Sequence, residues 1–163
     1  MKMKTWILAA AASVIVVSAA SALTAASREV ILIPEKGPVT IIPHERVQAS
    51  LDGRAGLHLL DAADIAVEGC FRDRPGGVEV HERLTNVFYI TDGEATMLIG
   101  GKNIGGKPTR PGEIRGGTVE GGTEYHVVKG DVVVVRPGIP TWFKEVPHKV
   151  SYFVVKKFET PPA

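Results

Sequence analysis

Cysteine is almost missing from the 163 residues: Cys70 stands alone, so no disulfide can form within the chain and the core must hold together without one. An excess of one charge is missing too, since 19 Lys and Arg balance 18 Asp and Glu. Because the sequence has no cluster of basic residues either, it lacks the electrostatic pattern of a nucleic-acid-binding protein. Cys70 lies in an apolar segment, and we interpret it as a buried thiol rather than a reactive one.

The only long apolar run is at the N-terminus. Two lysines precede the run Trp6–Ala20, and small residues follow it. This order is typical of a secretory signal peptide, residues 1–26, with cleavage after Ala22 or Ala26. An uncleaved membrane anchor is the alternative, since about 20 apolar residues can span a bilayer. We favour cleavage and expect an exported protein, periplasmic or secreted, with no membrane segment afterwards.

The rest of the chain divides into an N-terminal extension, residues 27–64, and a β-rich domain, residues 65–158. A short helix is expected in the extension over His44–Leu51, before Gly53. In the domain, β-branched and apolar runs alternate with Gly or Pro turns, which predicts an antiparallel sandwich or barrel. The expected strands are Ile65–Arg72, Val78–Arg83, Val87–Thr91, Ala95–Ile99, Glu124–Val128, Asp131–Arg136, Thr141–Glu145 and Lys149–Lys156.

One segment of the domain, Gly100–Gly122, is irregular and holds nine glycines. We expect a long loop or a pair of loops there. Long loops over the mouth of a barrel are often functional. The segment separates two blocks of strands that carry the most informative residue spacing in the chain.

In the first block, His81 precedes the turn glycine Gly93. The second block carries a spaced set of turn residues: Gly130, Arg136 and Gly138. Together these blocks resemble the paired motifs of the cupin superfamily, over roughly residues 65–155. The resemblance implies an all-β fold, a single cupin-type antiparallel β-barrel of jelly-roll type behind a short helical or extended N-terminal segment. It also implies a homodimer, for which the valine-rich strands Asp131–Val135 and Val150–Val155 are suited.

The positions at which cupins usually hold a metal are altered. His81 matches the first His of the family's His-x-His pair, whereas the other three positions hold Arg83, Asn86 and Thr141. Sites for divalent Fe, Mn or Zn typically need three or more His or carboxylate ligands. Glu79 and His126 could complete an unusual site with His81, although nothing in the spacing brings them together. The resemblance therefore implies a degenerate metal site, with a divalent metal left as an open alternative.

Residues two apart on a strand share a face, so Glu79, His81 and Arg83 are expected to point the same way. Facing into a barrel, such a row indicates a polar pocket or an internal ion-pair network, because a dry core would penalise it. The alternative is that this face is outward and solvated.

A pocket of this kind would suit a small acidic molecule. Arg83 can bind a carboxylate through two hydrogen bonds, and aromatic side chains can supply apolar walls. The predicted ligand-binding residues are Arg83, Asn86, Thr141, Glu79, His126, Phe88 and Trp142.

Two functions of different classes follow. The first is an exported, metal-free cupin-fold protein that binds a small polar or acidic molecule in its barrel. The second is an enzyme, an oxygenase, isomerase or lyase, with or without a metal, that uses His81 as metal ligand or general base. We favour binding and leave open whether the protein is catalytic. The expected partners are a small molecule and a second copy of the chain, with no nucleic acid.

Overall fold

The computed structural model describes residues 39–53 and 57–159. The predicted signal peptide and both of its cleavage sites lie outside the described residues. Within those residues, the elements follow the order α1 (His44–Asp52), β1 (Leu57–Asp61), β2 (Ile65–Arg72), β3 (Glu79–His81), β4 (Leu84–Ile99), β5 (Lys102–Ile104), β6 (Lys107–Arg110), β7 (Glu113–Arg115), β8 (Thr118–Glu120), β9 (Thr123–Val128), β10 (Val132–Val135), β11 (Thr141–Glu145) and β12 (Val150–Phe158). In 39–53 and 57–159, no helix has both the length and the apolar character needed to cross a membrane.

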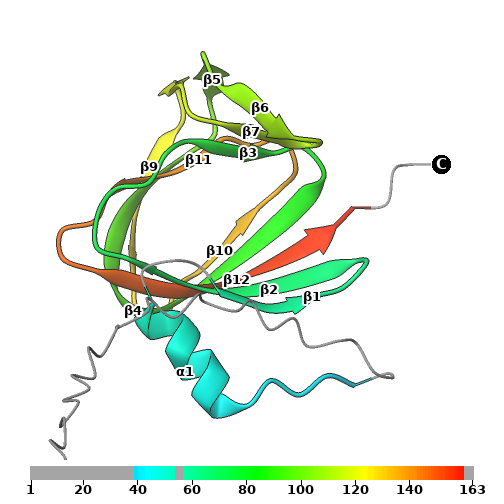
Figure 1. Cartoon of the computed structure of the whole chain (residues 1–163). Coiled ribbons are helices and arrows are strands. Elements are labelled where there is room, and N and C mark those ends of the chain that lie inside the picture. The colour runs from blue at the N-terminus through cyan, green and yellow to red at the C-terminus, as the bar shows by residue number, and fades with distance from the viewer. Residues whose placement is uncertain (1–38, 54–56, 160–163) are drawn as a thin grey trace, which may run out of the picture.

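The strands form a curled antiparallel sheet in the order β1-β2-β12-β4-β11-β3-β7-β6, as Figure 1 shows. β9 and β10 also pair with β4, and β5 pairs with β8 in a small ribbon of its own. β4 serves both halves of the curl, since residues 84–93 pair with β12 and residues 94–99 pair with β9. The predicted antiparallel β-barrel is thereby confirmed.

β4 corrects one prediction, because the expected turn at Asp92-Gly93 is part of a continuous strand. Gly93 has a φ of 75°, a conformation that L side chains rarely adopt. The carbonyl oxygen of Lys149 also fills the space that a Cβ at this position would need. Near Gly93 the register with β12 shifts, and a bulge of this kind bends a strand. The glycine therefore lets one strand pass from one half of the barrel to the other.

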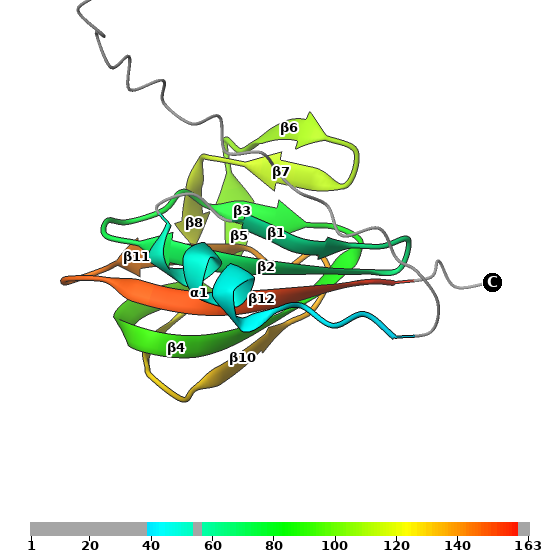
Figure 2. The same cartoon turned by 60° about the horizontal axis from the view of Figure 1, so that its bottom comes forward.

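The segment Gly100–Gly122 is also more ordered than predicted. Instead of a loop it holds the paired strands β5 and β8, and between them the hairpin of β6 and β7. β7 pairs with β3, so the hairpin extends the main sheet (Figure 2). β3 is shorter than its predicted strand: it ends at His81, and Glu82 and Arg83 form a turn.

The predicted helix is present as α1, which packs on the outside of the sheet (Figure 2). Its fully buried Ser50 lies so close to Gly69 of β2 that a Cβ at Gly69 would overlap the Ser50 side chain. At the end of α1, the Leu51 carbonyl accepts a hydrogen bond of 3.2 Å from the Ser151 hydroxyl of β12. β1, within the predicted extension, pairs with β2. α1 thus covers the sheet, and β1 widens it.

An apolar cluster fills the inside of the barrel. Ile90, Ala95, Met97 and Val150 are fully buried within it. Three aromatic residues close the cluster on one side: Phe88, Phe143 and Tyr152. Beyond them the interior is polar, and this polar part holds the candidate site.

Candidate functional site

A cavity of about 190 Å³ lies inside the barrel against the aromatic residues. At roughly 30 Å³ for one water molecule, it holds about six waters or one small organic molecule. Each strand contributes alternate residues, because residues two apart share a face. The lining residues of the two central strands are Glu68, Cys70 and Arg72 from β2 and Tyr152, Val154 and Lys156 from β12. The other lining residues are Asn86 and Phe88 from β4, Thr141 and Phe143 from β11, Glu79 and His81 from β3, Arg115 from β7, and Gly77, which precedes β3.

The aromatic wall is tightly packed. Phe143 stacks on Tyr152 with ring centroids 4.8 Å apart, and Phe88 meets Phe143 edge-on at 5.9 Å. Arg72 lies over the Phe143 ring at 5.1 Å, and its Nε donates a 2.9 Å hydrogen bond to the Tyr152 hydroxyl. Burial raises the pKa of Tyr152 far above its usual value, so the hydroxyl stays neutral. The wall is therefore apolar, with one arginine fixed at its edge.

One end of the cavity, which we call the Arg72 end, consists of Arg72, Glu79 and Arg115. Arg115 Nη1 donates a 3.0 Å hydrogen bond to Glu79 Oε1. Arg72 Nη2 lies 4.0 Å from the same oxygen, too far for a hydrogen bond. Arg72 therefore keeps guanidinium donors that can turn to a ligand, while Arg115 already bonds both Glu79 and Glu113.

The opposite end, which we call the Lys156 end, consists of Lys156, Glu68, Asn86 and His81. Lys156 Nζ forms a 2.6 Å ion pair with Glu68 Oε1. Asn86 Nδ2 lies 2.9 Å from His81 Nδ1, and since an amide nitrogen can only donate, Nδ1 accepts. Burial and then the nearby Lys156 charge lower the pKa of His81, so at neutral pH the ring is uncharged with its proton on Nε2.

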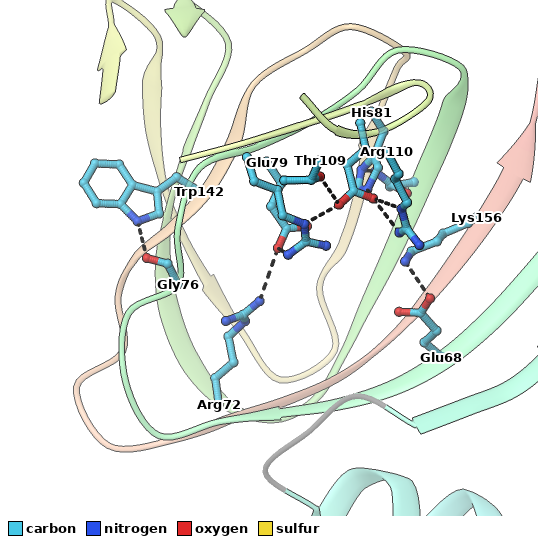
Figure 3. Close-up of polar contacts among 12 residues, drawn as sticks. Glu68, Arg72, Gly76, Glu79, His81, Thr109, Arg110, Trp142 and Lys156 are labelled. Carbon is cyan, nitrogen blue, oxygen red and sulfur yellow. Dashed lines mark hydrogen bonds and ion pairs between the residues drawn. The ribbon is translucent and has the colours of Figure 1, made fainter. Parts of the chain in front are cut away.

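Glu113 of β7 ties the β6–β7 hairpin to this end, and Figure 3 shows Thr109 and Arg110 of that hairpin close to His81. The Glu113 side chain is only 4% exposed, and its Oε2 lies 3.5 Å from His81 Nε2. It accepts hydrogen bonds from Arg110 Nε at 2.6 Å, from Thr109 Oγ1 at 3.2 Å and from Arg115 Nε. Burial would raise the pKa of Glu113, but the hydrogen bonds from Arg115 and Arg110 outweigh it and hold the pKa at about 2. The carboxylate is thus ionised and saturated with donors.

No family model and no curated protein matches this sequence. Solved structures do match. The protein BH2720 from Bacillus halodurans aligns with a TM-score of 0.55 at 12% identity, over 80% of this chain and 89% of that one. A protein from Klebsiella pneumoniae with a double-stranded β-helix domain aligns with a TM-score of 0.50 at 14% identity, over 78% and 95%. The cupin protein BF4112 from Bacteroides fragilis aligns with a TM-score of 0.50 at 12% identity, over 79% and 91%. The chain has the cupin fold.

Five of the predicted site residues meet in the cavity of this cupin barrel: Glu79, His81, Asn86, Phe88 and Thr141. Arg83 does not join them. It is exposed in the turn after β3, so the expected row of three side chains ends at His81. Arg83 instead lines a second cavity of about 410 Å³, which shares Glu68, His81 and Lys156 with the first.

The two other predicted residues lie away from the cupin cavity. His126 on β9 is 57% exposed, and its Nε2 lies 3.2 Å from Glu94 Oε2. Trp142 points from β11 to the other side of the strand than Thr141, and its Nε1 donates a 2.8 Å hydrogen bond to the Gly76 carbonyl (Figure 3).

The positively charged side chains that line the cavity of this cupin barrel were not predicted from the sequence. Arg72 and Lys156 alternate with apolar residues on predicted strands, so the period of two could have identified them. Arg115 and Glu113 come from the segment expected to be a loop, and no strand period was visible there. The missed residues are Glu68, Arg72, Glu113, Arg115, Tyr152 and Lys156.

The described residues do not fit the metal that cupins usually hold. Because His126 lies away from the cavity, the possible set of His81, Glu79 and His126 is not assembled. Over 39–53 and 57–159, no three His, Cys, Asp or Glu side chains form a group that could hold a metal. The carboxylate nearest His81, that of Glu113, is bonded to two guanidinium groups, and their positive charge opposes a cation.

Proposed function

We propose that this protein is exported and that its cupin barrel binds a small carboxylic acid without a metal. The observation that carries the proposal is the charge of the cavity. Three cations line it, Arg72, Arg115 and Lys156, against the two carboxylates of Glu68 and Glu79, while His81 is neutral. The wall thus has one positive charge in excess, and a bound carboxylate would balance it.

Arg72 is the residue that we propose as the anchor of the carboxylate. Its Nε is held by the Tyr152 hydroxyl, and its guanidinium carbon lies over the Phe143 ring, so the guanidinium is ordered before a ligand arrives. A planar guanidinium with donors to spare matches the two oxygens of a carboxylate. The aromatic wall beside it suits an apolar ligand body, and the volume of about 190 Å³ limits that body to a small one.

The position of His81 favours binding over proton transfer. Nδ1 accepts from Asn86, and Nε2 faces Glu113 rather than an open space. A general base needs a free nitrogen within hydrogen-bond reach of the substrate proton. Both ring nitrogens of His81 are instead turned to protein side chains, which supports a positioning role.

Export and homodimerisation stay predictions. Export rests on the sequence of residues 1–26 alone. For the dimer, Val132 and Val134 of β10 are 60% and 52% exposed and would supply an apolar face. β12 would not, because Val150 and Val154 are buried in the core of their own barrel.

The variant Arg72→Gln tests the proposed anchor. Calorimetric titration with butyrate, hexanoate and benzoate, each beside its primary amide, first identifies the carboxylate that binds most tightly. We expect Arg72→Gln to weaken that binding by about 10- to 100-fold, since a hydrogen bond to a charged group contributes about 1.5–3 kcal/mol. Arg74→Gln is the matched control, because Arg74 is exposed and does not line the cavity. Equal affinities of the two variants, or equal binding of acid and amide, would contradict the proposal.

A further inference from the structure

The two ends of the cavity differ in charge and are well separated. Glu68 and Arg72 point inward from β2 four residues apart, so their Cα atoms are about 13 Å apart at 3.3 Å per residue. In Figure 3, Arg72 with Glu79 and Lys156 with Glu68 lie on different sides of the view. Between them the wall is apolar, with Phe88, Phe143 and Val154. A ligand that fills the cavity therefore meets two polar ends and an apolar middle.

The Arg72 end is positive, because Arg72 and Arg115 share Glu79, while Glu113, to which Arg115 is also bonded, is paired with Arg110 as well; three guanidinium groups thus face two carboxylates. The Lys156 end is balanced, because Lys156 is paired with Glu68 and the His81 ring carries no charge. A second carboxylate at the Lys156 end would approach the Glu68 carboxylate, with which Lys156 is already paired. The charge distribution thus accepts one carboxylate and disfavours two.

The Lys156 end nevertheless has hydrogen-bonding capacity to spare. An ammonium has three donors and a carboxylate has several acceptor positions, and their mutual ion pair uses only part of them. Asn86 Oδ1 is buried at this end without a hydrogen-bond partner, and His81 Nε2, which faces Glu113 Oε2 at 3.5 Å, has no hydrogen bond either. Buried polar atoms are rarely left in this state, and each such atom has a free-energy cost. A group that both donates and accepts, such as a hydroxyl, matches this surplus.

We infer that the ligand is a hydroxy acid, with a carboxylate at one end and a neutral hydroxyl at the other, joined by a short apolar chain. The carboxylate binds at the Arg72 end, and the hydroxyl binds at the Lys156 end. This inference rests on the proposed function and adds the second polar group and its place. Because the side chains of both ends extend into the gap, the ligand is shorter than the separation of their Cα atoms.

Three probes of equal chain length test the inference in the wild-type protein: hexanoate, 6-hydroxyhexanoate and adipate. We expect 6-hydroxyhexanoate to bind about fivefold more tightly than hexanoate, in the range of one added neutral hydrogen bond. Adipate should bind more weakly than 6-hydroxyhexanoate, because its second carboxylate meets Glu68. If hexanoate binds as tightly as 6-hydroxyhexanoate, the inference is wrong while the proposed function stands. If none of the three binds, the inference is wrong, and the proposed function fails with it when butyrate and benzoate do not bind either.

Glu68→Gln should reverse the preference of the protein for 6-hydroxyhexanoate over adipate. Without the Glu68 charge, Lys156 gives that end a net positive charge, and adipate should then bind about tenfold more tightly than it does to the wild type. Glu120→Gln is the control, because Glu120 is exposed on β8 and lines neither cavity. An unchanged order of the three probes in folded Glu68→Gln, checked by circular dichroism, would overturn the inference. If that variant does not fold, the wild-type order alone decides.

Discussion

Replacing Gly93 with alanine is expected to lower the free energy of unfolding by about 4 kcal/mol or more, the range of the most damaging single substitutions. Two costs add at this residue. Its φ of 75° is unfavourable for any L side chain, by about 1–2 kcal/mol. The new Cβ would also collide with the carbonyl oxygen of Lys149, which directly precedes β12 and accepts a hydrogen bond from Glu94 N, and backbone cannot move aside as a side chain can. β4 would lose its bend, and with it the pairing of both halves.

Gly130→Ala separates the conformational cost of a positive φ from the cost of the collision with backbone. Gly130 has a φ of 98°, but no atom lies within 4 Å of the position of a Cβ there. Its substitution should therefore cost only the conformational part, about 1–2 kcal/mol. Urea unfolding of both variants and the wild type measures the difference. Similar losses of unfolding free energy for Gly93→Ala and Gly130→Ala would contradict the close approach of the Lys149 carbonyl oxygen to Gly93.

The second large effect is expected at Glu113, where Glu113→Gln should destabilise the protein by about 3 kcal/mol at pH 7. The pKa of Glu113 is about 2 in the folded protein against its ordinary value of 4.5, and a difference of one pKa unit corresponds to about 1.4 kcal/mol. The wild type has this stabilisation in full above pH 4.5, and loses it as the pH falls from 4.5 towards 2. The difference in the free energy of unfolding between the wild type and Glu113→Gln should therefore narrow as the pH falls from 4.5 towards 2.

Denaturant unfolding at several pH values between 7 and 3 tests this expectation. Glu124→Gln serves as the control, because Glu124 forms an exposed ion pair with Lys144, and such surface pairs contribute about 1 kcal/mol or less. A loss at Glu113 no larger than at Glu124, or a loss that does not change with pH, would contradict the account of Glu113 as the carboxylate that fastens the β6–β7 hairpin.

The fold could be predicted from the sequence where strand period and turn residues agree. β2 and β11 have the predicted bounds, Ile65–Arg72 and Thr141–Glu145, because β-branched and aromatic residues alternate there between Gly and Pro turns. The turn expected at Gly93 was wrong for a physical reason. A glycine with positive φ marks either a turn or a bulge, and only the pairing of β4 with β12 before it and with β9 after it decides between them.

The site could be predicted only in part. The motif spacing located three site residues correctly, since His81, Asn86 and Thr141 do line the cavity. Arg83 was expected beside His81 on the assumption that the strand continues, whereas β3 ends at His81. The site residues from the β6–β7 hairpin could not be predicted, because its short glycine-flanked strands show no hydrophobic period in the sequence. They form because β7 pairs with β3 and with β6.

The central claim, a carboxylate bound at Arg72 inside the barrel, is tested most directly by an NMR titration of isotope-labelled protein. The titrant is the carboxylate that binds most tightly, compared with its primary amide. We predict saturable shifts of the Arg72 Nε–H, of the Phe143 and Tyr152 rings and of the Asn86 side-chain amide, with the exposed His126 ring unchanged. The amide should leave the Arg72 signal in place. Shifts confined to Arg83 and His126, or no shift at Arg72 at saturating carboxylate, would contradict the claim.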